Sequence, residues 1–313
     1  MDTTIPFVHR VSPAEADAWL AALRDAAPEL SIVDFARLSD AERASARVAI
    51  AANPDASALR TLPELRWIQS LWAGVEGIVQ ELADLPVPIV RMQDPQMAET
   101  MAEAVLTWTL YLHRDMPRYF RQQLLSQWLQ HPVRLARERR VGILGLGKLG
   151  TAAAQVLCQH GFHVSGWSGS EKSAAFATYW GTDGLYQLLS LSDIVIVLAP
   201  LTEATRGLLD ARALSVLPQG ASVINFARGA LIDDQALLQA LDAGHLSHAV
   251  LDVFTQEPLP AHSAFWQHAK ITVLPHVSAP TNKPTACAIV ARQLRNYFST
   301  GAIPAAVDRS RGY

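Results

Sequence analysis

Short apolar runs alternate with longer stretches of helical spacing along the whole chain. In the first hundred residues this pattern is typical of a small α/β unit with five short strands. The predicted strands are residues 5–10, 31–35, 48–51, 67–71 and 88–92. Ser12, Pro13 and Glu15 have the spacing of a capping box with proline at the first helical position, so we expect a helix to begin there.

A second capping-box pattern begins at Thr100 and ends at Glu103. It precedes an apolar-periodic segment that reaches about Trp128, and we expect one long helix here. We place the end of the first domain at this helix. The four arginines of residues 134–140 could bind phosphate, but the pattern favours a solvated surface ahead of the next strand.

The stretch RVGILGLGKLG, residues 140–150, is an apolar run that breaks into three glycines and is followed by a helical pattern. This is the dinucleotide-binding spacing G-x-G-x-x-G. It assigns a tight turn to Gly145, close approach to a pyrophosphate to Gly147, and close packing of helix on strand to Gly150. The alternative is a glycine-rich turn of any α/β protein, and only its context decides between the two.

Further strands are predicted beyond the glycines, at residues 163–167, 193–198, 221–226, 248–253 and 271–274. Their near-continuous apolar character is typical of parallel strands buried on both faces, with helices such as residues 233–243 between them. We therefore predict a doubly wound sheet. A last helix, residues 286–298, is expected to return to the first domain, which divides the chain into residues 1–100, 101–280 and 281–313.

The composition fits an enzyme of two ordinary domains. Half of the 313 residues are hydrophobic, and the net charge of -3 offers no basic footprint for nucleic acid or an anionic membrane. No apolar run is long enough to span a bilayer and no secretory segment precedes the first strand, so we expect a cytoplasmic protein. Cys158 and Cys287 match no disulfide or metal pattern and are expected to be buried free thiols, and no histidine pattern indicates a metal site.

Three of the predicted strands end in polar or ionisable residues. Arg228, Glu257 and His276 follow successive strands, and a cation, an acid and an imidazole together suit the reduction of a carbonyl group. Taken alone, each has a structural alternative as a surface charge or a solvated histidine. The loop of residues 71–75 also follows a strand, and is either part of a substrate site or an ordinary turn.

These motifs resemble the D-isomer-specific 2-hydroxyacid dehydrogenase family over nearly the whole chain. The segments GLGKLG, LAPLTEATRGLL, NFARGALID, LDVFTQEPLP and LPHVSAPT occur in the family's order. The segments RMQDPQMAETMAEAV, WQHAKITVLPHVSAPT and VDRSRGY are most similar to its glyoxylate/hydroxypyruvate reductase A branch. The resemblance implies a Rossmann cofactor domain inserted into a smaller flavodoxin-like substrate domain, both with doubly wound parallel sheets.

The resemblance also implies a role for each residue of the site. Arg228 binds the substrate carboxylate, His276 protonates the keto oxygen, and Glu257 holds the imidazole. Trp72, Ala73 and Gly74 are assigned to substrate through their loop, and Asp252 to the nicotinamide end. The cofactor-binding positions are Gly145, Gly147, Lys148, Leu149, Gly150, Trp167, Ser168, Ser170, Lys172, Ala199, Pro200, Thr205, Phe226, Ala227, Asp252 and Ser278.

Trp72 departs from the smaller residue that is common in this loop of the family. The indole either narrows the substrate pocket and favours acids of two or three carbons, or packs against a neighbouring loop or subunit. The sequence leaves both open.

The end of the second cofactor-domain strand predicts which nicotinamide is used. NAD-dependent folds carry an acidic residue about 20 residues after the glycines, and Ser168 occupies that place here. Ser168 and Ser170 can donate hydrogen bonds to a 2′-phosphate and Lys172 supplies charge, so NADPH is expected with NADH weaker. Gly169, where related reductases often carry arginine, and the acidic Glu171 reduce the expected preference. A polar turn that does not discriminate is the alternative.

These residues and the resemblance predict an NADPH-preferring reductase of small 2-oxo acids, acting on glyoxylate and hydroxypyruvate. The resemblance also implies a homodimer, and the long helix headed by Thr100 carries more apolar residues than one face needs. A dehydrogenase of a larger D-2-hydroxy acid is one alternative. The other is a dinucleotide-sensing binding protein like the relatives that act in transcriptional corepression. The complete set of Arg228, Glu257 and His276 favours an enzyme.

Overall fold

Two compact units make up the structure, a computed structural model that describes residues 4–309. The larger unit comprises residues 97–280, and the smaller one comprises the chain before it and the chain from residue 281 onward. Each unit is built on its own parallel sheet. A Rossmann-type unit is thus inserted into a smaller flavodoxin-like one, which confirms the predicted fold class.

The smaller unit has five parallel strands in the flavodoxin-like order β2-β1-β3-β4-β5. The strands are β1 (Ile5–His9), β2 (Ile32–Asp34), β3 (Val48–Ala52), β4 (Trp67–Ser70) and β5 (Ile89–Val90). The helices are α1 (Pro13–Ala26), α2 (Asp40–Ser45), α3 (Ala56–Arg60), α4 (Glu76–Glu81) and α11 (Lys283–Thr300), with a 3₁₀ turn at Phe35–Arg37. All five strands lie where the apolar runs predict them.

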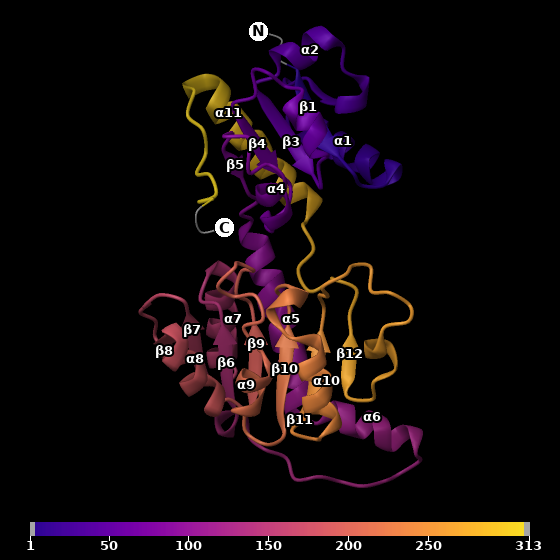
Figure 1. The fold of residues 1–313 in the computed structure, drawn as a ribbon, viewed down its shortest axis with the longest axis vertical. Coiled ribbons are helices and arrows are strands. Elements are labelled where there is room, and N and C mark those ends of the chain that lie inside the picture. The colour runs from indigo at the N-terminus through magenta and orange to yellow at the C-terminus, as the bar shows by residue number, and fades with distance from the viewer. Residues whose placement is uncertain (1–3, 310–313) are drawn as a thin grey trace. The chain divides into compact units, whose positions relative to one another are not determined.

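Helices cover both faces of this sheet. Phe7 and Ile50 pack with Trp19 of α1 and Val290 of α11 on one face, and Figure 1 shows α11, in yellow, beside the first strands. The chain after α11 stays with this unit, because the Val307 N–H donates to the Ile89 carbonyl at 2.8 Å. Residues 310–313 of the terminal VDRSRGY segment lie outside the described residues.

The larger unit has seven parallel strands in the order β12-β11-β10-β9-β6-β7-β8. The strands are β6 (Arg140–Leu144), β7 (His163–Ser168), β8 (Ala177–Trp180), β9 (Ile194–Val197), β10 (Ala221–Asn225), β11 (Leu246–Leu251) and β12 (Ile271–Val273). The helices are α5 (Pro95–His113), α6 (Met116–Leu124), α7 (Lys148–Gln159), α8 (Gly181–Ser190), α9 (Ala211–Ser215) and α10 (Asp234–Asp242). Short 3₁₀ turns lie at Ala136–Glu138, Gly229–Leu231 and Ala264–Gln267.

Successive residues of its central strands face opposite layers of helices. Ile196 of β9 packs with Val105 of α5 and Leu157 of α7, whereas the preceding Val195 packs with Leu188 of α8. Strands buried on both faces explain the near-continuous apolar runs. The predicted doubly wound sheet is confirmed.

The helix expected from Thr100 begins earlier than the sequence analysis predicts. The Asp94 carboxylate accepts the Gln96 N–H at 2.9 Å, and α5 starts at Pro95. An acidic cap followed by proline is a strong start signal, so Thr100 lies inside the helix rather than at its cap.

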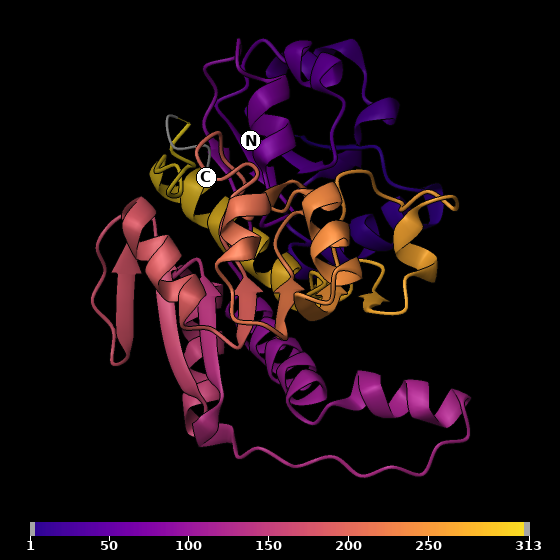
Figure 2. The same cartoon turned by 60° about the horizontal axis from the view of Figure 1, so that its bottom comes forward.

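The same helix does not reach Trp128. Pro117 has no N–H to donate to the carbonyl four residues earlier, so one continuous helix cannot pass through it. Asp115 takes a left-handed φ of 53°, and the shorter α6 begins at Met116. Figure 2 shows α6 and the extended chain after it forming an arm outside the sheet of the larger unit.

Two further expectations were incomplete or wrong. The edge strand β8 was not predicted, because its residues are exposed or half-buried and carry no buried apolar run. Cys158 was expected to be buried but is exposed on α7, whereas Cys287 is buried in α11, and both thiols are free. In the described part of the chain, no helix combines the length and apolar character needed to span a bilayer.

His248 is a buried histidine of β11 with an incomplete set of partners. Its Nε2 lies 2.9 Å from the Thr272 hydroxyl, while its Nδ1 is buried with no hydrogen-bond partner among the described residues. Burial, with smaller effects from Arg121 and His268, lowers the pKa of His248 from 6.5 to about 4. The imidazole is therefore neutral in the folded protein at neutral pH.

This burial predicts an acid-sensitive contribution to stability. As the pH falls from 6.5 to about 4, His248 takes up a proton in the unfolded chain but not in the folded one. The free energy of unfolding falls over this window by about 3 kcal/mol, since a tenfold change in proton affinity corresponds to about 1.4 kcal/mol. Denaturant unfolding of the protein and of His248→Gln should differ in this pH slope. Exposed His160→Gln is the control, and parallel slopes in all three proteins would contradict the prediction.

Candidate functional site

Parallel pairing brings three loops to one edge of the larger sheet. Asn225 of β10 pairs with Leu251 of β11, and Leu251 pairs with Val273 of β12. The chain therefore leaves all three strands at the same level. The loops that follow carry Arg228, Glu257 and His276, so the structure brings these three predicted residues together.

His276 and Glu257 form a short hydrogen bond, with Nδ1 and Oε2 2.7 Å apart. A carboxylate can only accept, so the Nδ1 atom carries the proton and Nε2 is left for another partner. The other oxygen of Glu257 accepts the Phe254 N–H at 2.9 Å, which fixes the carboxylate in turn. The imidazole side chain is 52% exposed.

The two groups shift each other's proton affinity. The hydrogen bond that His276 donates to Glu257 raises the pKa of His276, outweighing burial and the nearby Arg228. Burial alone would raise the pKa of Glu257, but the hydrogen bonds from His276 and Phe254 outweigh it and lower that pKa. The pair therefore favours imidazolium beside carboxylate, which is the state of a proton donor.

The loop of Arg228 is held by a residue that the sequence analysis did not single out. The Asn225 side chain is buried, donates to the Arg228 carbonyl at 2.9 Å and accepts the Ala227 N–H at 3.1 Å. The Arg228 guanidinium donates back to the Ala227 carbonyl at 2.6 Å. A buried amide at a strand end was the available signal for this role.

Gly229 is the second residue that the sequence analysis missed. A Cβ at this position would lie 2.1 Å from the Phe254 carbonyl carbon and 2.3 Å from the Thr255 nitrogen. Only glycine lets the loop after β10 approach the loop after β11 this closely. The sequence shows a glycine next to the arginine, but it does not show which backbone segment the glycine contacts.

The three fingerprint glycines lie where β6 turns into α7. Gly145 has φ = 109°, and a Cβ there would meet the Ala199 backbone nitrogen at 2.4 Å. A Cβ at Gly150 would lie 1.9 Å from the Gly145 carbonyl oxygen, whereas the space around Gly147 is open for 4 Å. The turn therefore requires glycine at Gly145, and close packing requires it at Gly150. Gly147 leaves room for a ligand at the start of α7.

The polar turn after β7 is partly engaged in its own hydrogen bonds. The Ser168 hydroxyl is buried and donates to the Ser170 carbonyl at 2.7 Å, so its proton serves the turn. Ser170 is exposed, and the Lys172 ammonium donates to the Leu146 carbonyl of the glycine loop at 2.7 Å. Trp167 is buried, with its indole N–H bonded to the Gly181 carbonyl.

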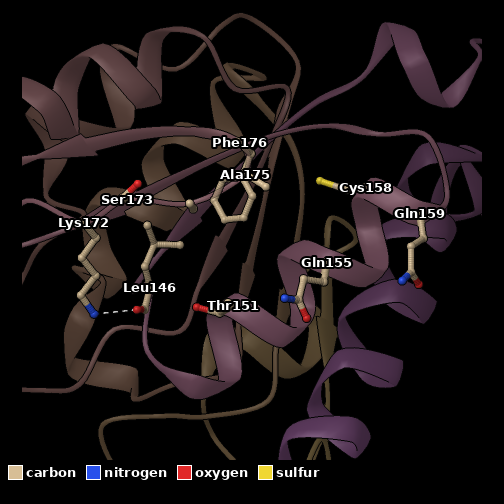
Figure 3. A pocket seen from close by; sticks show the side chains of 10 residues that line it. Leu146, Thr151, Gln155, Cys158, Gln159, Lys172, Ser173, Ala175 and Phe176 are labelled. Atoms are coloured by element: carbon tan, nitrogen blue, oxygen red, sulfur yellow. Dashed lines mark hydrogen bonds between the residues drawn. The ribbon is translucent and has the colours of Figure 1, made fainter.

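A cavity of about 500 Å³ adjoins this turn. Figure 3 shows it between one side of α7, with Thr151, Gln155 and Cys158, and the segment from Lys172 to Phe176. Leu146 and Lys172 lie at one end of the cavity, so the space is continuous with the glycine loop.

The other predicted cofactor positions surround the same strand ends. Ala199 and Pro200 follow β9, and the Thr205 hydroxyl donates to the Pro200 carbonyl at 2.6 Å. Phe226 and Ala227 follow β10 and are buried, while Lys148 and Leu149 form the first turn of α7. Leu149 is half-buried and packs against the core.

Asp252 and Ser278 are joined by a hydrogen bond at the turn that carries His276. Both oxygens of the buried Asp252 carboxylate accept backbone N–H groups, from Val277 at 2.8 Å and Ser278 at 2.9 Å. The Ser278 hydroxyl is buried with no hydrogen-bond partner among the described residues. A polar group of a ligand would satisfy it, which fits the assignment of Ser278 to a cofactor.

Trp72 belongs to the smaller unit and follows β4. Its half-buried indole packs edge-on against Trp19 of α1, with ring centroids 5.7 Å apart and planes at 77°. The ring therefore contributes to the core of its own unit. The assignment of Trp72, Ala73 and Gly74 to substrate stays a prediction. Between residues 4 and 309, no group of three His, Cys, Asp or Glu side chains is arranged to hold a metal ion.

A glycine turn at a helix start, and an imidazole held by a carboxylate at the same edge of the sheet, together define the class of dinucleotide-dependent oxidoreductases. Residues 106–278 match the family model described as D-isomer specific 2-hydroxyacid dehydrogenase, NAD binding domain. The chain belongs to the D-isomer-specific 2-hydroxyacid dehydrogenase family, which confirms the resemblance.

Solved structures of this family cover the full chain. A D-isomer specific 2-hydroxyacid dehydrogenase from Xanthobacter autotrophicus Py2, in complex with NADPH and MES, is 36% identical over 100% of both chains, with a TM-score of 0.92. An NADPH-dependent glyoxylate/hydroxypyruvate reductase from Sinorhizobium meliloti, in complex with NADP and sulfate, is 30% identical over 99% of this chain and 100% of that one, with a TM-score of 0.90. A family member from Klebsiella pneumoniae 342 is 32% identical over 99% of this chain and 98% of its own, with a TM-score of 0.90.

The close approach at Gly229 predicts a costly substitution. In Gly229→Ala the new methyl group meets backbone atoms that cannot rotate away, so the free energy of unfolding should fall by about 1–3 kcal/mol. The matched control is Gly169→Ala, where nothing lies within 4 Å of the added Cβ and stability should stay within about 0.5 kcal/mol. Denaturant unfolding measures both, and equal stability of the two variants would show that Gly229 is not needed for the approach.

Proposed function

We propose that this protein reduces small 2-oxo acids with NADPH, converting glyoxylate to glycolate and hydroxypyruvate to D-glycerate. The observation that carries the proposal is the His276–Glu257 pair, 2.7 Å apart, with Arg228 near enough to affect the pKa of both residues. A proton donor next to a cation that binds carboxylates fits a 2-oxo acid better than a simple ketone.

Arg228, His276 and Glu257 divide the work of this reaction among them. Arg228 binds the substrate carboxylate and polarises the keto oxygen, and a guanidinium suits this because it offers parallel donors. A nicotinamide held at this edge would supply the hydride for the carbonyl carbon. His276 gives its Nε2 proton to the carbonyl oxygen, so that C=O becomes CH–OH, and Glu257 stabilises the imidazolium before the transfer.

The carboxyl edge of the larger sheet holds the cofactor in this proposal. The open space at Gly147 and the N–H groups at the start of α7 suit a pyrophosphate. Ala199, Pro200, Thr205, Phe226 and Ala227 line the cofactor beyond it, and Ser278 receives a polar group of the nicotinamide end. Asp252 belongs to the same end.

Two alternatives make different demands on the same residues. A dinucleotide-sensing binding protein would need the glycine turn but not the His276–Glu257 hydrogen bond. A dehydrogenase of a larger D-2-hydroxy acid would need both, and would differ in which substrate is turned over fastest.

A panel of 2-oxo acids assayed with NADPH and NADH tests the proposal. We expect turnover of glyoxylate and hydroxypyruvate, and in Arg228→Lys a fall in kcat/KM of about 10- to 100-fold, because a charge-assisted hydrogen bond is lost. NADPH binding, followed by fluorescence, should survive. Arg212→Lys, which replaces an arginine stacked on Tyr186, is the control. Turnover of no 2-oxo acid by the parent protein would favour the binding protein.

The nicotinamide preference follows from the turn after β7. With the Ser168 proton used inside the turn, the exposed Ser170 and the Lys172 ammonium remain as donors to a 2′-phosphate. We expect kcat/KM to favour NADPH over NADH by about tenfold to a hundredfold, the effect of one or two exposed charge-assisted hydrogen bonds. Ser168→Asp should move the ratio toward NADH, while the isosteric, uncharged Ser168→Asn should move it less. An NADH preference in the parent protein would show that this turn does not recognise the 2′-phosphate of NADPH.

We also propose that the protein is a homodimer, in which the arm of α6 and the following chain contacts a second copy. Part of the apolar surface of α5 is also uncovered, since Trp108 and Tyr111 are half-buried and Leu110 is 37% exposed. The arm adds the exposed side chains of Phe120, Leu124, Leu125, Trp128, Leu129 and Val133, with Trp128 97% exposed. Exposed apolar residues gathered on one segment are typical of a protein interface.

Sedimentation at micromolar concentration tests the homodimer. We expect the parent protein to sediment as a dimer and Trp128→Ser to shift toward monomer, because a large apolar contact is removed. Trp266→Ser removes a half-exposed tryptophan of the same unit outside the arm and should leave the dimer intact. A monomeric parent protein would contradict the proposal.

A further inference from the structure

The loop that carries His276 is tied to the end of β11 by one residue. Asp252 directly follows that strand, and its side chain is 1% exposed. Its two carboxylate oxygens accept the Val277 and Ser278 N–H groups, and its own carbonyl accepts the His276 N–H at 3.0 Å. The backbone N–H groups of three successive residues, 276 to 278, therefore all donate to a single aspartate.

His276 needs such a restraint because of its backbone conformation. Its φ of 55° lies in the left-handed region, which residues other than glycine rarely adopt without support. The Glu257 carboxylate fixes only the ring, through Nδ1. The conformation of the chain at His276 is held from the other side by Asp252.

We propose that Asp252 is a positioning residue for His276: its carboxylate holds residues 276–278 in the left-handed turn that presents the imidazole for proton transfer. This goes beyond the assignment of Asp252 to the nicotinamide end, since both oxygens are already engaged with the protein backbone. The proposal rests on the proposed function only for what the imidazole does, not for how it is held.

Asp252 also contributes to the charge around the imidazole. Glu257 and Asp252 favour the protonated ring, whereas Arg228 disfavours it. Loss of the Asp252 charge therefore acts in the same direction as loss of Glu257. Both losses make the imidazolium easier to deprotonate.

The test is Asp252→Asn, which keeps one acceptor oxygen but turns an NH₂ group toward the other backbone N–H. We expect kcat for 2-oxo acid reduction to fall about 10- to 100-fold, because a small displacement of the proton donor is enough. The Kd of NADPH should stay within about threefold. The alkaline limb of the kcat pH profile should move to lower pH, as it should in Glu257→Gln. Asp210→Asn is the matched control, because Asp210 caps α9 and an asparagine can still accept the Ala213 N–H there.

A second readout does not depend on activity. NMR titration of ¹³C-labelled histidine, with His276 assigned from His276→Gln, should show a lower His276 pKa in Asp252→Asn. In the unmodified protein the Val277 and Ser278 amides should be protected from hydrogen exchange, so the proposal can be tested even if the variant does not fold.

Two outcomes would overturn the proposal. One is a raised Kd of NADPH with kcat and the pH profile unchanged, which would leave Asp252 as a cofactor contact only. The other is unprotected Val277 and Ser278 amides in the unmodified protein. Failure of the proposed function looks different, because the unmodified protein would then reduce no 2-oxo acid while the NMR results stayed as expected.

Discussion

The candidate site depends on the parallel pairing of β10, β11 and β12. Because Asn225, Leu251 and Val273 share one level of the sheet, the residues that follow them enter neighbouring loops at a common height. A slip of one residue in any strand would turn its side chains to the opposite face of the sheet and move its loop out of level with the others. The register of these strands therefore brings the imidazole, the carboxylate and the guanidinium to one edge of the sheet.

The sequence was most informative where a physical requirement is local. Apolar runs located eleven of the twelve strands that residues 4–309 form, and the exception, β8, lies at a sheet edge without a buried run. The ends of helices were harder to predict from the sequence. The pattern at Thr100 resembles a cap, yet Asp94 and Pro95 start the helix, and Pro117 rather than the fading of the apolar pattern ends its continuity. Several possible start and end signals for a helix lie close together in this segment, and the sequence alone does not show which of them the fold uses.

For the site, the order of the motifs identified the residues that carry the chemistry but not the residues that hold them in place. Arg228, Glu257 and His276 could be named from the sequence, whereas the roles of Asn225 and Gly229 depend on backbone groups that come near only in the folded sheet. The indole of Trp72 shows the same limit, since its partner Trp19 lies on a helix far away in the chain. Contacts between distant segments are the part that a single sequence cannot supply.

The two cysteines differ in whether a thiol reagent can reach them in the folded protein. Cys158 is exposed on α7 of the larger unit, so a thiol reagent reaches it in the native state. Cys287 is 1% exposed in α11 of the smaller unit, and burial raises the pKa of its thiol to about 11. Its modification therefore waits for α11 to separate from the sheet. The rate at which Cys287 reacts therefore measures how often α11 opens from the smaller unit.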